Sequence, residues 1–128
     1  YLKSRLSDLY DIAFDGICMH EFVMTLEQEK HARNVSALDI AKALLDHGIH
    51  PPTMYFPLIV HEALMIEPTE TESRETLDEA VQIFLDVLAE AEAHPEKMHE
   101  YPLETPVRRL DEVGAARKPV VRYLYDEE

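Results

Sequence analysis

The chain has 128 residues, of which 46% are hydrophobic, so it is long enough for one domain with a buried core. Its formal net charge of −14 at pH 7 argues against binding to nucleic acid or to anionic membrane surfaces, because both need Lys and Arg on the protein. No apolar run is long enough to span a bilayer, and no secretory signal pattern is evident. The single cysteine, Cys18, cannot form an internal disulfide, so we expect a reducing, cytoplasmic location.

The first third of the chain predicts a helix and then a strand. Residues 15–16, Asp-Gly, are a turn signal that separates the two. Residues 22–26 alternate in a way typical of a strand that is apolar on both faces, and residues 27–34 are polar and predict a loop. Because the chain starts at Tyr1 inside a helical pattern, we expect it to be a piece of a longer polypeptide. The helical stripe consists of Leu2, Leu6, Leu9 and Ala13.

A second helix is predicted to start after Ser36, whose hydroxyl can accept a hydrogen bond from an unpaired backbone N–H. Gly48 is expected to end this helix, because glycine adopts the left-handed conformation without strain. The stretch 50–57 follows, His-Pro-Pro-Thr-Met-Tyr-Phe-Pro, in which two adjacent prolines remove two backbone donors. We therefore expect an ordered, extended loop here and no regular strand.

The second half predicts a short strand over 63–67 that is closed by Pro68. Thr69 and Glu72 have the spacing of a capping box for a long helix, which Pro95 ends. Only Val120 to Tyr125 could form a strand in the remainder. The apolar stripe of the long helix consists of Leu77, Val81, Phe84, Leu88 and Ala91.

This order of elements predicts an α+β fold with helices on one face of a mainly antiparallel sheet. We expect residues 1–94 to form a small α+β domain. Residues 95–128 contain four of the chain's prolines together with basic pairs, and we expect them to form a C-terminal arm of the same domain. Its apolar residues are too many for a solvated tail, so we expect the arm to pack on other parts of a larger enzyme or on a neighbouring copy.

Few residues offer a pattern for chemistry. The seven histidines show no spacing typical of metal ligands, and we expect them to lie in solvent and to bind no metal. Cys18 precedes a strand and is expected to be a buried small side chain. With three glycines the chain has no glycine-rich phosphate loop. The acidic run 67–72 is better explained by a strand end and an acidic first helical turn than by a cation site.

One segment offers convergent polar groups on a stiff backbone. His50, Thr53 and Tyr55 supply an imidazole and two hydroxyls within the proline-rich stretch 50–57. Such groups are typical of the lining of a binding site. A structural loop whose polar groups are satisfied internally explains the same residues, and the residues alone leave both interpretations open.

Several segments, in order along the chain, closely resemble the P-protein of the glycine cleavage system, glycine dehydrogenase (decarboxylating). The sequence around Pro51 is similar to that of the second subunit of the two-subunit bacterial form. The segments are His20-Glu21-Phe22-Val23, Asp39-Ile40-Ala41-Lys42-Ala43-Leu44-Leu45-Asp46, Gly48-Ile49-His50-Pro51-Pro52-Thr53-Met54-Tyr55-Phe56-Pro57, Leu64-Met65-Ile66-Glu67-Pro68-Thr69-Glu70-Thr71-Glu72 and Thr105-Pro106-Val107-Arg108-Arg109-Leu110-Asp111-Glu112.

The resemblance implies the small C-terminal domain of an aspartate-aminotransferase-like, fold type I enzyme that depends on pyridoxal phosphate. It implies that the whole enzyme decarboxylates glycine and transfers the aminomethyl group to the lipoyl arm of H-protein. The implied partners are the upstream cofactor-binding domain, subunit 1 of the P-protein and lipoylated H-protein, in an oligomer. In this class the loop at 50–57 and the strand end at 64–69 face the substrate, so Glu67 joins His50, Thr53 and Tyr55 as expected cleft residues.

The chain departs from the family's pattern at the cofactor lysine, which follows a histidine and precedes a glycine-rich run. None of its five lysines, Lys3, Lys30, Lys42, Lys97 and Lys118, has that context. We therefore expect the cofactor lysine to lie upstream, and we expect the fragment alone to bind no pyridoxal phosphate and to be inactive. The region 64–69 also lacks the arginine that holds a substrate carboxylate in many relatives of this class.

Two other functions remain open on the residues alone. A free-standing regulatory domain that binds an amino acid would need a repeated β-α-β unit, which the loop at 51–57 interrupts. A purely structural module that binds a partner is supported by the long basic and proline-containing tail.

Overall fold

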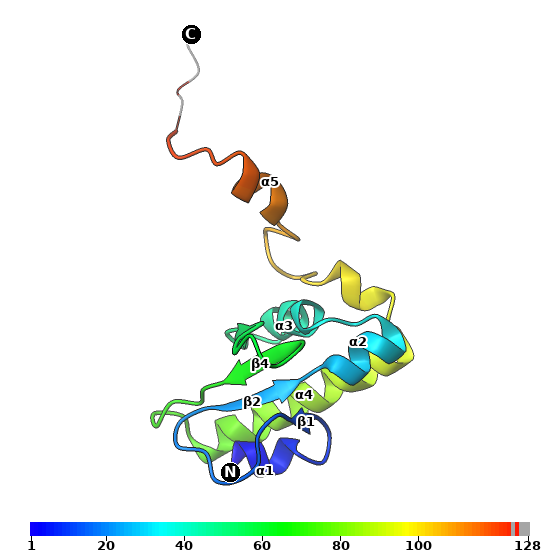
Figure 1. Ribbon diagram of the computed structural model, residues 1–128, viewed down its shortest axis with the longest axis vertical. Helices are drawn as coiled ribbons and strands as arrows, with labels where there is room; N and C mark the ends of the chain where they lie inside the picture. The colour runs from blue at the N-terminus through cyan, green and yellow to red at the C-terminus, as the bar shows by residue number, and fades with distance from the viewer. Residues whose placement is uncertain (124, 126–128) are drawn as a thin grey trace.

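The computed structural model describes residues 1–123 and 125. It contains a four-stranded sheet in the order β1-β2-β4-β3, in which all neighbouring strands are antiparallel (Figure 1). Helices α1, α3 and α4 pack on one face of this sheet, which confirms the predicted α+β architecture. The elements are α1 Leu2–Leu6, β1 Asp11–Ile12, β2 Phe22–Thr25, α2 Glu27–Arg33, α3 Ala37–Asp46, β3 Thr53–Met54, β4 Ala63–Ile66, α4 Arg74–Ala93, a 3-10 turn at Lys97–Glu100, and α5 Glu112–Arg117.

The two central strands fix which side chains enter the core. Phe22 of β2 lies opposite Ile66 of β4, and Met24 lies opposite Leu64. Because side chains alternate along a strand, these four residues share the face that the helices cover. The opposite face carries the residues between them. The predicted strands at 22–26 and 63–67 are thus confirmed to within one residue.

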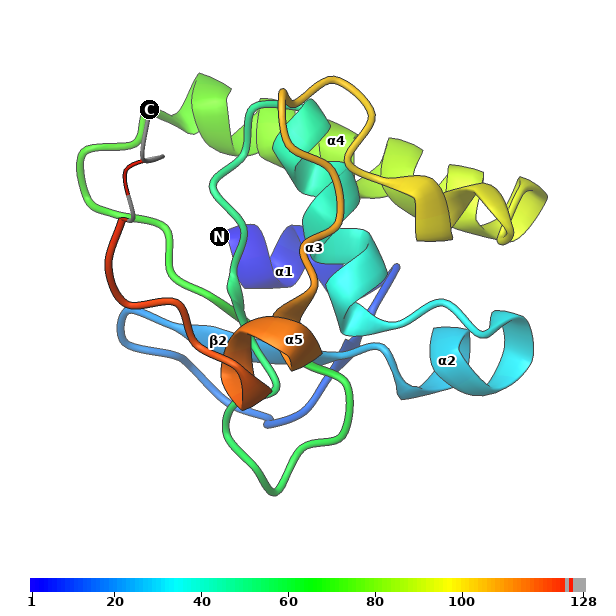
Figure 2. The same cartoon turned by 90° about the horizontal axis from the view of Figure 1, so that it is seen from above.

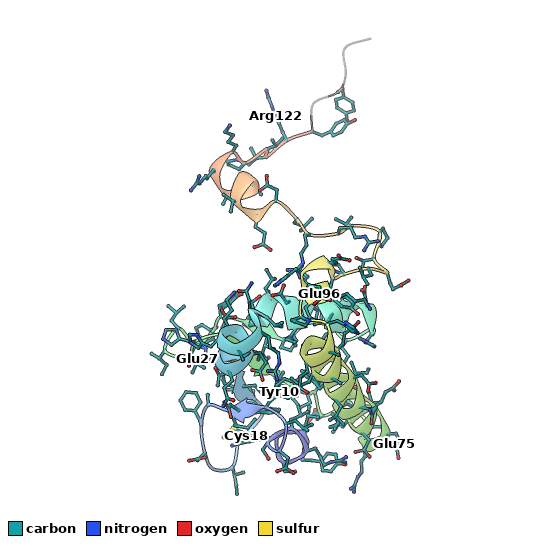
Figure 3. All side chains as sticks on the ribbon, turned by 90° about the vertical axis from the view of Figure 1, so that its right-hand side faces the viewer. Tyr10, Cys18, Glu27, Glu75, Glu96 and Arg122 are labelled. Atoms are coloured by element: carbon teal, nitrogen blue, oxygen red, sulfur yellow. The ribbon has the colours of Figure 1, made fainter. Side chains whose placement is uncertain are left out.

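The core lies between this sheet face and helices α1, α3 and α4. Tyr10 is 3% exposed, and its hydroxyl donates to the Phe84 carbonyl oxygen at 2.8 Å (Figure 3). Its ring meets the Phe84 ring edge to face, with centroids 5.8 Å apart. Burial raises the pKa of the Tyr10 hydroxyl, with Glu29 and Glu92 adding to the shift. This contact joins the end of the first segment to the long helix.

Two predictions for the first third of the chain are wrong. The first helix is predicted to continue to Ala13, but it ends at Leu6. The backbone amides of Leu9 and Tyr10 both donate to the Leu6 carbonyl, and the chain then turns into the edge strand β1. Residues 27–34, predicted as a loop, contain helix α2. This helix buries no side chain, so it has no apolar stripe to reveal it. It ends at Asn34, which adopts the left-handed conformation with φ 59°.

Helix α3 forms as predicted and is capped at both ends. The Ser36 hydroxyl accepts from the Asp39 amide, and the Asp39 carboxylate accepts from the Ser36 amide, which completes a capping box. A third group, the Glu62 carboxylate, accepts from the Ala37 amide at 2.7 Å. At the other end Gly48 has a φ of 76°, which reverses the chain toward the proline-rich loop.

The long helix α4 starts later than the sequence predicts. Ser73 is its N-cap and accepts from the Thr76 amide at 3.2 Å, so the expected capping box of Thr69 and Glu72 is wrong. Thr69 instead bonds Thr71, hydroxyl to hydroxyl, at 2.7 Å in the turn before the helix. The helix ends at Ala93, two residues before Pro95, as predicted.

The segment after α4 first packs on the body and then leaves it. Met98 and Tyr101 are buried in the main core, so packing continues past the boundary expected at residue 94. Beyond Arg109, which still bonds Asp39 of α3, the chain turns away and carries α5, which buries no side chain (Figure 1). The expected strand from Val120 to Tyr125 includes Leu124, which lies outside the described residues. The remaining residues of that stretch form no strand.

No described helix combines the length and the apolar character needed to cross a membrane. Within residues 1–123 and 125, no three His, Cys, Asp or Glu side chains cluster closely enough to hold a metal ion.

Candidate functional site

A cleft of about 460 Å³ opens beside the proline-rich loop. Its walls come from residues 48–53 after α3, the end of β4, the turn before α4, the first half of α4, and Leu2 of α1. Its floor is apolar and consists of core side chains that include Ile66, Leu77 and Phe84. A polar rim on an apolar floor is the usual form of a small-molecule site, so this cleft is the candidate functional site.

The cleft brings together three of the four predicted site residues. His50 and Thr53 come from the loop, and Glu67 comes from the end of β4. Gly48 turns the chain into the loop. The prediction that this loop contains no regular strand is wrong, because residues 53–54 form β3, which pairs with β4 and fixes Thr53 opposite Met65. No side-chain hydrogen bond to another described residue engages His50, Thr53 or Glu67, and all three are exposed. Their polar groups therefore remain available to a ligand.

Tyr55, the fourth predicted residue, does not line this cleft. Its φ is 57°, so the alternation of side chains that would place it beside Thr53 breaks at this residue. Its amide donates to the Ala63 carbonyl at 2.9 Å, and its ring lies near the start of α3. Burial raises the pKa of the Tyr55 hydroxyl and the Glu62 charge raises it further, while the nearby Ser36 hydroxyl and Leu38 backbone act to lower it.

Three further polar residues complete the rim: Thr69 and Glu72 from the turn before α4, and Thr76 from its first turn. Thr69 falls within the region 64–69 that is expected to face the substrate, whereas Glu72 and Thr76 are not predicted there, because Glu72 is assigned to a helix cap. The signal that could have found them is the competing cap Ser73, three residues before Thr76, which leaves Glu72 in the preceding turn.

The cleft is acidic. Its rim carries Glu67 and Glu72 with one imidazole, and no Lys or Arg among the described residues lines it. Such a lining disfavours a phosphate or a carboxylate, because like charges repel across a short distance. It favours a neutral or cationic group instead.

A second polar cluster holds the C-terminal segment against α3. Arg109 donates to the Asp39 carboxylate at 2.7 Å, to the Met98 carbonyl at 3.0 Å, and to the Tyr101 carbonyl. Asp39 is 4% exposed. Burial alone would raise the pKa of Asp39, but hydrogen bonds from Ser36 and Arg109 outweigh it and hold that pKa below its usual value. This cluster is structural, since no buried side-chain nitrogen or oxygen of the described residues lacks a hydrogen-bond partner.

The domain is thus of the small α+β class, with helices on one face of an antiparallel sheet and a cleft beside the sheet. The family model described as glycine dehydrogenase, C-terminal domain, matches residues 1–106, and the chain belongs to this family.

Particular relatives agree with this assignment. A probable glycine dehydrogenase (decarboxylating) subunit 2 from Treponema denticola is 63% identical over 96% of this chain and 26% of its own length. The protein of the same description from Thermosipho melanesiensis is 57% identical over 100% of this chain and 27% of its own length. One from Listeria innocua is 56% identical over 96% and 25%. The chain spans about a quarter of the length of these relatives.

Proposed function

We propose that this chain is the C-terminal domain of a subunit 2 polypeptide whose whole enzyme decarboxylates glycine and passes the aminomethyl group to the lipoyl arm of H-protein. The observation that carries the proposal is the match of the family model over residues 1–106, together with 57% identity to one relative over the full chain. Identity at this level over an entire domain supports the same role within the larger enzyme.

The cofactor proposed for the whole enzyme is pyridoxal phosphate, which supplies the electron sink for decarboxylation. The residues of this chain do not fit it. No described lysine or arginine lines the cleft, and two glutamates on its rim would repel the cofactor's phosphate. The groups that hold the cofactor are therefore assigned to the part of the polypeptide that this chain does not span, and the isolated chain is proposed to be inactive.

We propose that His50, Thr53 and Glu67 face the substrate side of the cofactor in the whole enzyme. Their common position on one cleft rim, with no partners among the described side chains, supports this role. An acidic rim would also bind the glycine carboxylate weakly in the ground state. Weak binding of the group that leaves is favourable, because uniform binding of substrate and transition state does not accelerate the step. Tyr55 stays a prediction, since its hydroxyl lies near α3.

The proposed partners are subunit 1, which the name of the relatives' subunit 2 implies, and lipoylated H-protein, within an oligomer. We propose a cytoplasmic location. The competing amino-acid-binding domain with a repeated β-α-β unit is not favoured, because α4 is followed by a 3-10 turn and an arm, with no strand among the described residues of that region.

The test uses the full-length subunit 2 that contains this chain, combined with subunit 1, pyridoxal phosphate and H-protein. Carbon dioxide release from carboxyl-labelled glycine is measured with lipoylated H-protein and, as the control, with H-protein that lacks the lipoyl group. We expect release that depends on the lipoyl arm. A cofactor-loaded complex that leaves glycine intact in both arms would refute the proposal.

A further inference from the structure

Apolar side chains stand exposed on two loops, residues 13–20 and 55–61. In the first loop Ile17 is 104% exposed and Met19 is 94% exposed. In the second loop Leu58 and Ile59 are 84% and 80% exposed. Soluble monomers rarely expose contiguous apolar patches beyond about 300–600 Å². We name the following set the loop face: Phe14, Ile17, Met19, Phe56, Leu58 and Ile59.

The two loops border one hollow of about 350 Å³. Phe14, Ile17 and Met19 line it from the first loop, and Pro57 lines it from the second, with Met65 of β4 beneath. Both loops lie on the side of the sheet that faces away from α4 (Figure 2). The helices cover one sheet face, so the loop face is the domain's second, unfinished apolar layer.

The backbone of both loops is held in place. The Lys3 ammonium donates to the carbonyls of Phe14 and Gly16, at 2.8 and 2.7 Å. Gly16 has a φ of 88°, a conformation that residues with a side chain rarely adopt. The second loop is closed by the Val60 amide on the Pro57 carbonyl at 3.0 Å, and its end is held by Thr25. The loop face is therefore preformed, as a docking surface with a fixed partner requires.

We propose that the loop face packs against the part of the subunit 2 polypeptide that this chain does not span. The relatives are about four times as long as the region they share with this chain, which covers 25–27% of them. A covalently attached partner is present at high effective concentration, so it covers an apolar face without needing high affinity. The occupant we assign has an apolar surface with basic residues around it.

Charge argues against a second copy of this chain as the occupant. Asp15 and Glu21 border the same hollow, and the Lys3 ammonium beside them is already occupied by two carbonyls. A two-fold contact would place this acidic rim against itself. Each copy also carries a formal net charge of −14, which adds repulsion between copies.

The experiment is hydroxyl-radical footprinting of full-length subunit 2 without subunit 1, read by mass spectrometry. Met19 is the reporter, and Met98, which is fully buried in this domain, is the internal standard of the same chemistry. We expect Met19 to be oxidised at least about tenfold more slowly than in its free tryptic peptide, near the rate of Met98, because packing at interior density excludes solvent. The protection should not change on dilution or on addition of subunit 1.

Three results would overturn the proposal. Oxidation of Met19 at the rate of its peptide would mean an uncovered face. Protection that disappears on dilution would assign the face to a second copy, and protection that appears only with subunit 1 would assign it to that subunit. The inference rests on family membership and not on glycine chemistry. The oxidation rate of Met19 therefore tests it whether or not the enzyme releases carbon dioxide from glycine.

A pair of variants gives an independent measurement in the same full-length protein. Leu58→Glu places a charge on the loop face, and Ala89→Glu places the same charge at an exposed position of α4. We expect Leu58→Glu to restore oxidation of Met19 while Met98 stays protected, and Ala89→Glu to change neither. If Leu58→Glu leaves Met19 protected in a folded protein, the two loops do not share one occupant.

Discussion

Asp39 is the one buried charged side chain in the described part of the chain, and it links three segments. It closes the capping box of α3 with Ser36 and receives Arg109 from the C-terminal segment at 2.7 Å. His99 lies 3.4 Å from the same carboxylate, through its Nδ1. A buried carboxylate with these donors stabilises the fold only while it is ionised.

The Asp39→Asn variant tests this at the residue scale. The native pKa of Asp39 is lowered, so its contribution is fully present above the unfolded value, near 4, and is lost as the pH falls through the native pKa. We expect the substitution to cost about 1–3 kcal/mol at pH 7 and to flatten the fall in stability below about pH 4. Urea unfolding at several pH values measures both effects. Asp8→Asn, at an exposed carboxylate, is the control and should retain the native slope.

Thr53 is the residue whose role in the cleft can be tested most cleanly. Thr53→Val keeps the shape and the β propensity of the side chain but removes the hydroxyl. In the full enzyme we expect kcat/KM for glycine to fall about tenfold, the loss of one hydrogen bond of about 1.4 kcal/mol, with Tm unchanged. Thr105→Val, whose hydroxyl donates to the Val107 carbonyl outside the cleft lining, is the control. If the two variants have the same kcat/KM for glycine, the loop has only a structural role.

At the scale of elements, the C-terminal segment is bound to α3 by charge-assisted contacts at both ends of that helix. Asp46, in the last turn, accepts from the Glu104 amide at 3.0 Å and from the Leu103 amide. Near the first turn, Arg109 joins Asp39 to the carbonyls of Met98 and Tyr101. This explains why residues 97–109 stay with the body although they contain little regular structure.

Arg109→Lys should loosen this segment. A lysine ammonium cannot reproduce the planar fork that reaches one carboxylate and two carbonyls at once. We expect a loss of about 1–2 kcal/mol in unfolding free energy and faster amide exchange over residues 101–109. The control is Arg117→Lys in α5, where the side chain is exposed. If both variants exchange at the native rate, Arg109 contributes no more than a surface charge.

For the molecule as a whole, the outer arm carries charge of the opposite sign to the body. This arm, residues 110–123, contains three basic and two acidic residues, whereas the whole chain has a formal net charge of −14. Their apolar side chains are exposed, and Arg122 lies far from the body in Figure 3. We propose that this arm, part of the region 95–128, packs elsewhere in the whole enzyme.

Hydrogen exchange tests the arm. The amides of residues 110–123 should gain about tenfold or more in protection when this chain is part of the assembled enzyme, because docking slows their opening. Amides of β2 and β4 serve as the reference, since they are already paired within the domain. Unchanged fast exchange of the arm in the assembled enzyme would show that it docks nowhere.

Cofactor binding is also a property of the whole molecule. We expect the isolated chain to bind no pyridoxal phosphate, because the described lining of its cleft offers no lysine or arginine for the phosphate. Absorbance titration followed by borohydride reduction measures this, and full-length subunit 2 is the positive control. A stoichiometric, reduction-trapped cofactor on one of the five lysines of the isolated chain would contradict the expectation.

The sequence by itself determined the elements that bury an apolar face and the turns that glycine and proline enforce. Strands β2 and β4 and helices α3 and α4 were predictable because their apolar periodicity is local. Helix α2 was not, because it buries nothing and leaves no stripe. The tertiary structure alone decided which polar residues meet. The shift of the α4 cap to Ser73 releases Glu72 to the cleft, and the positive φ of Tyr55 turns that side chain away from it. Both outcomes depend on competition between local hydrogen bonds and contacts made with residues distant in the chain, which a pattern of neighbours does not encode.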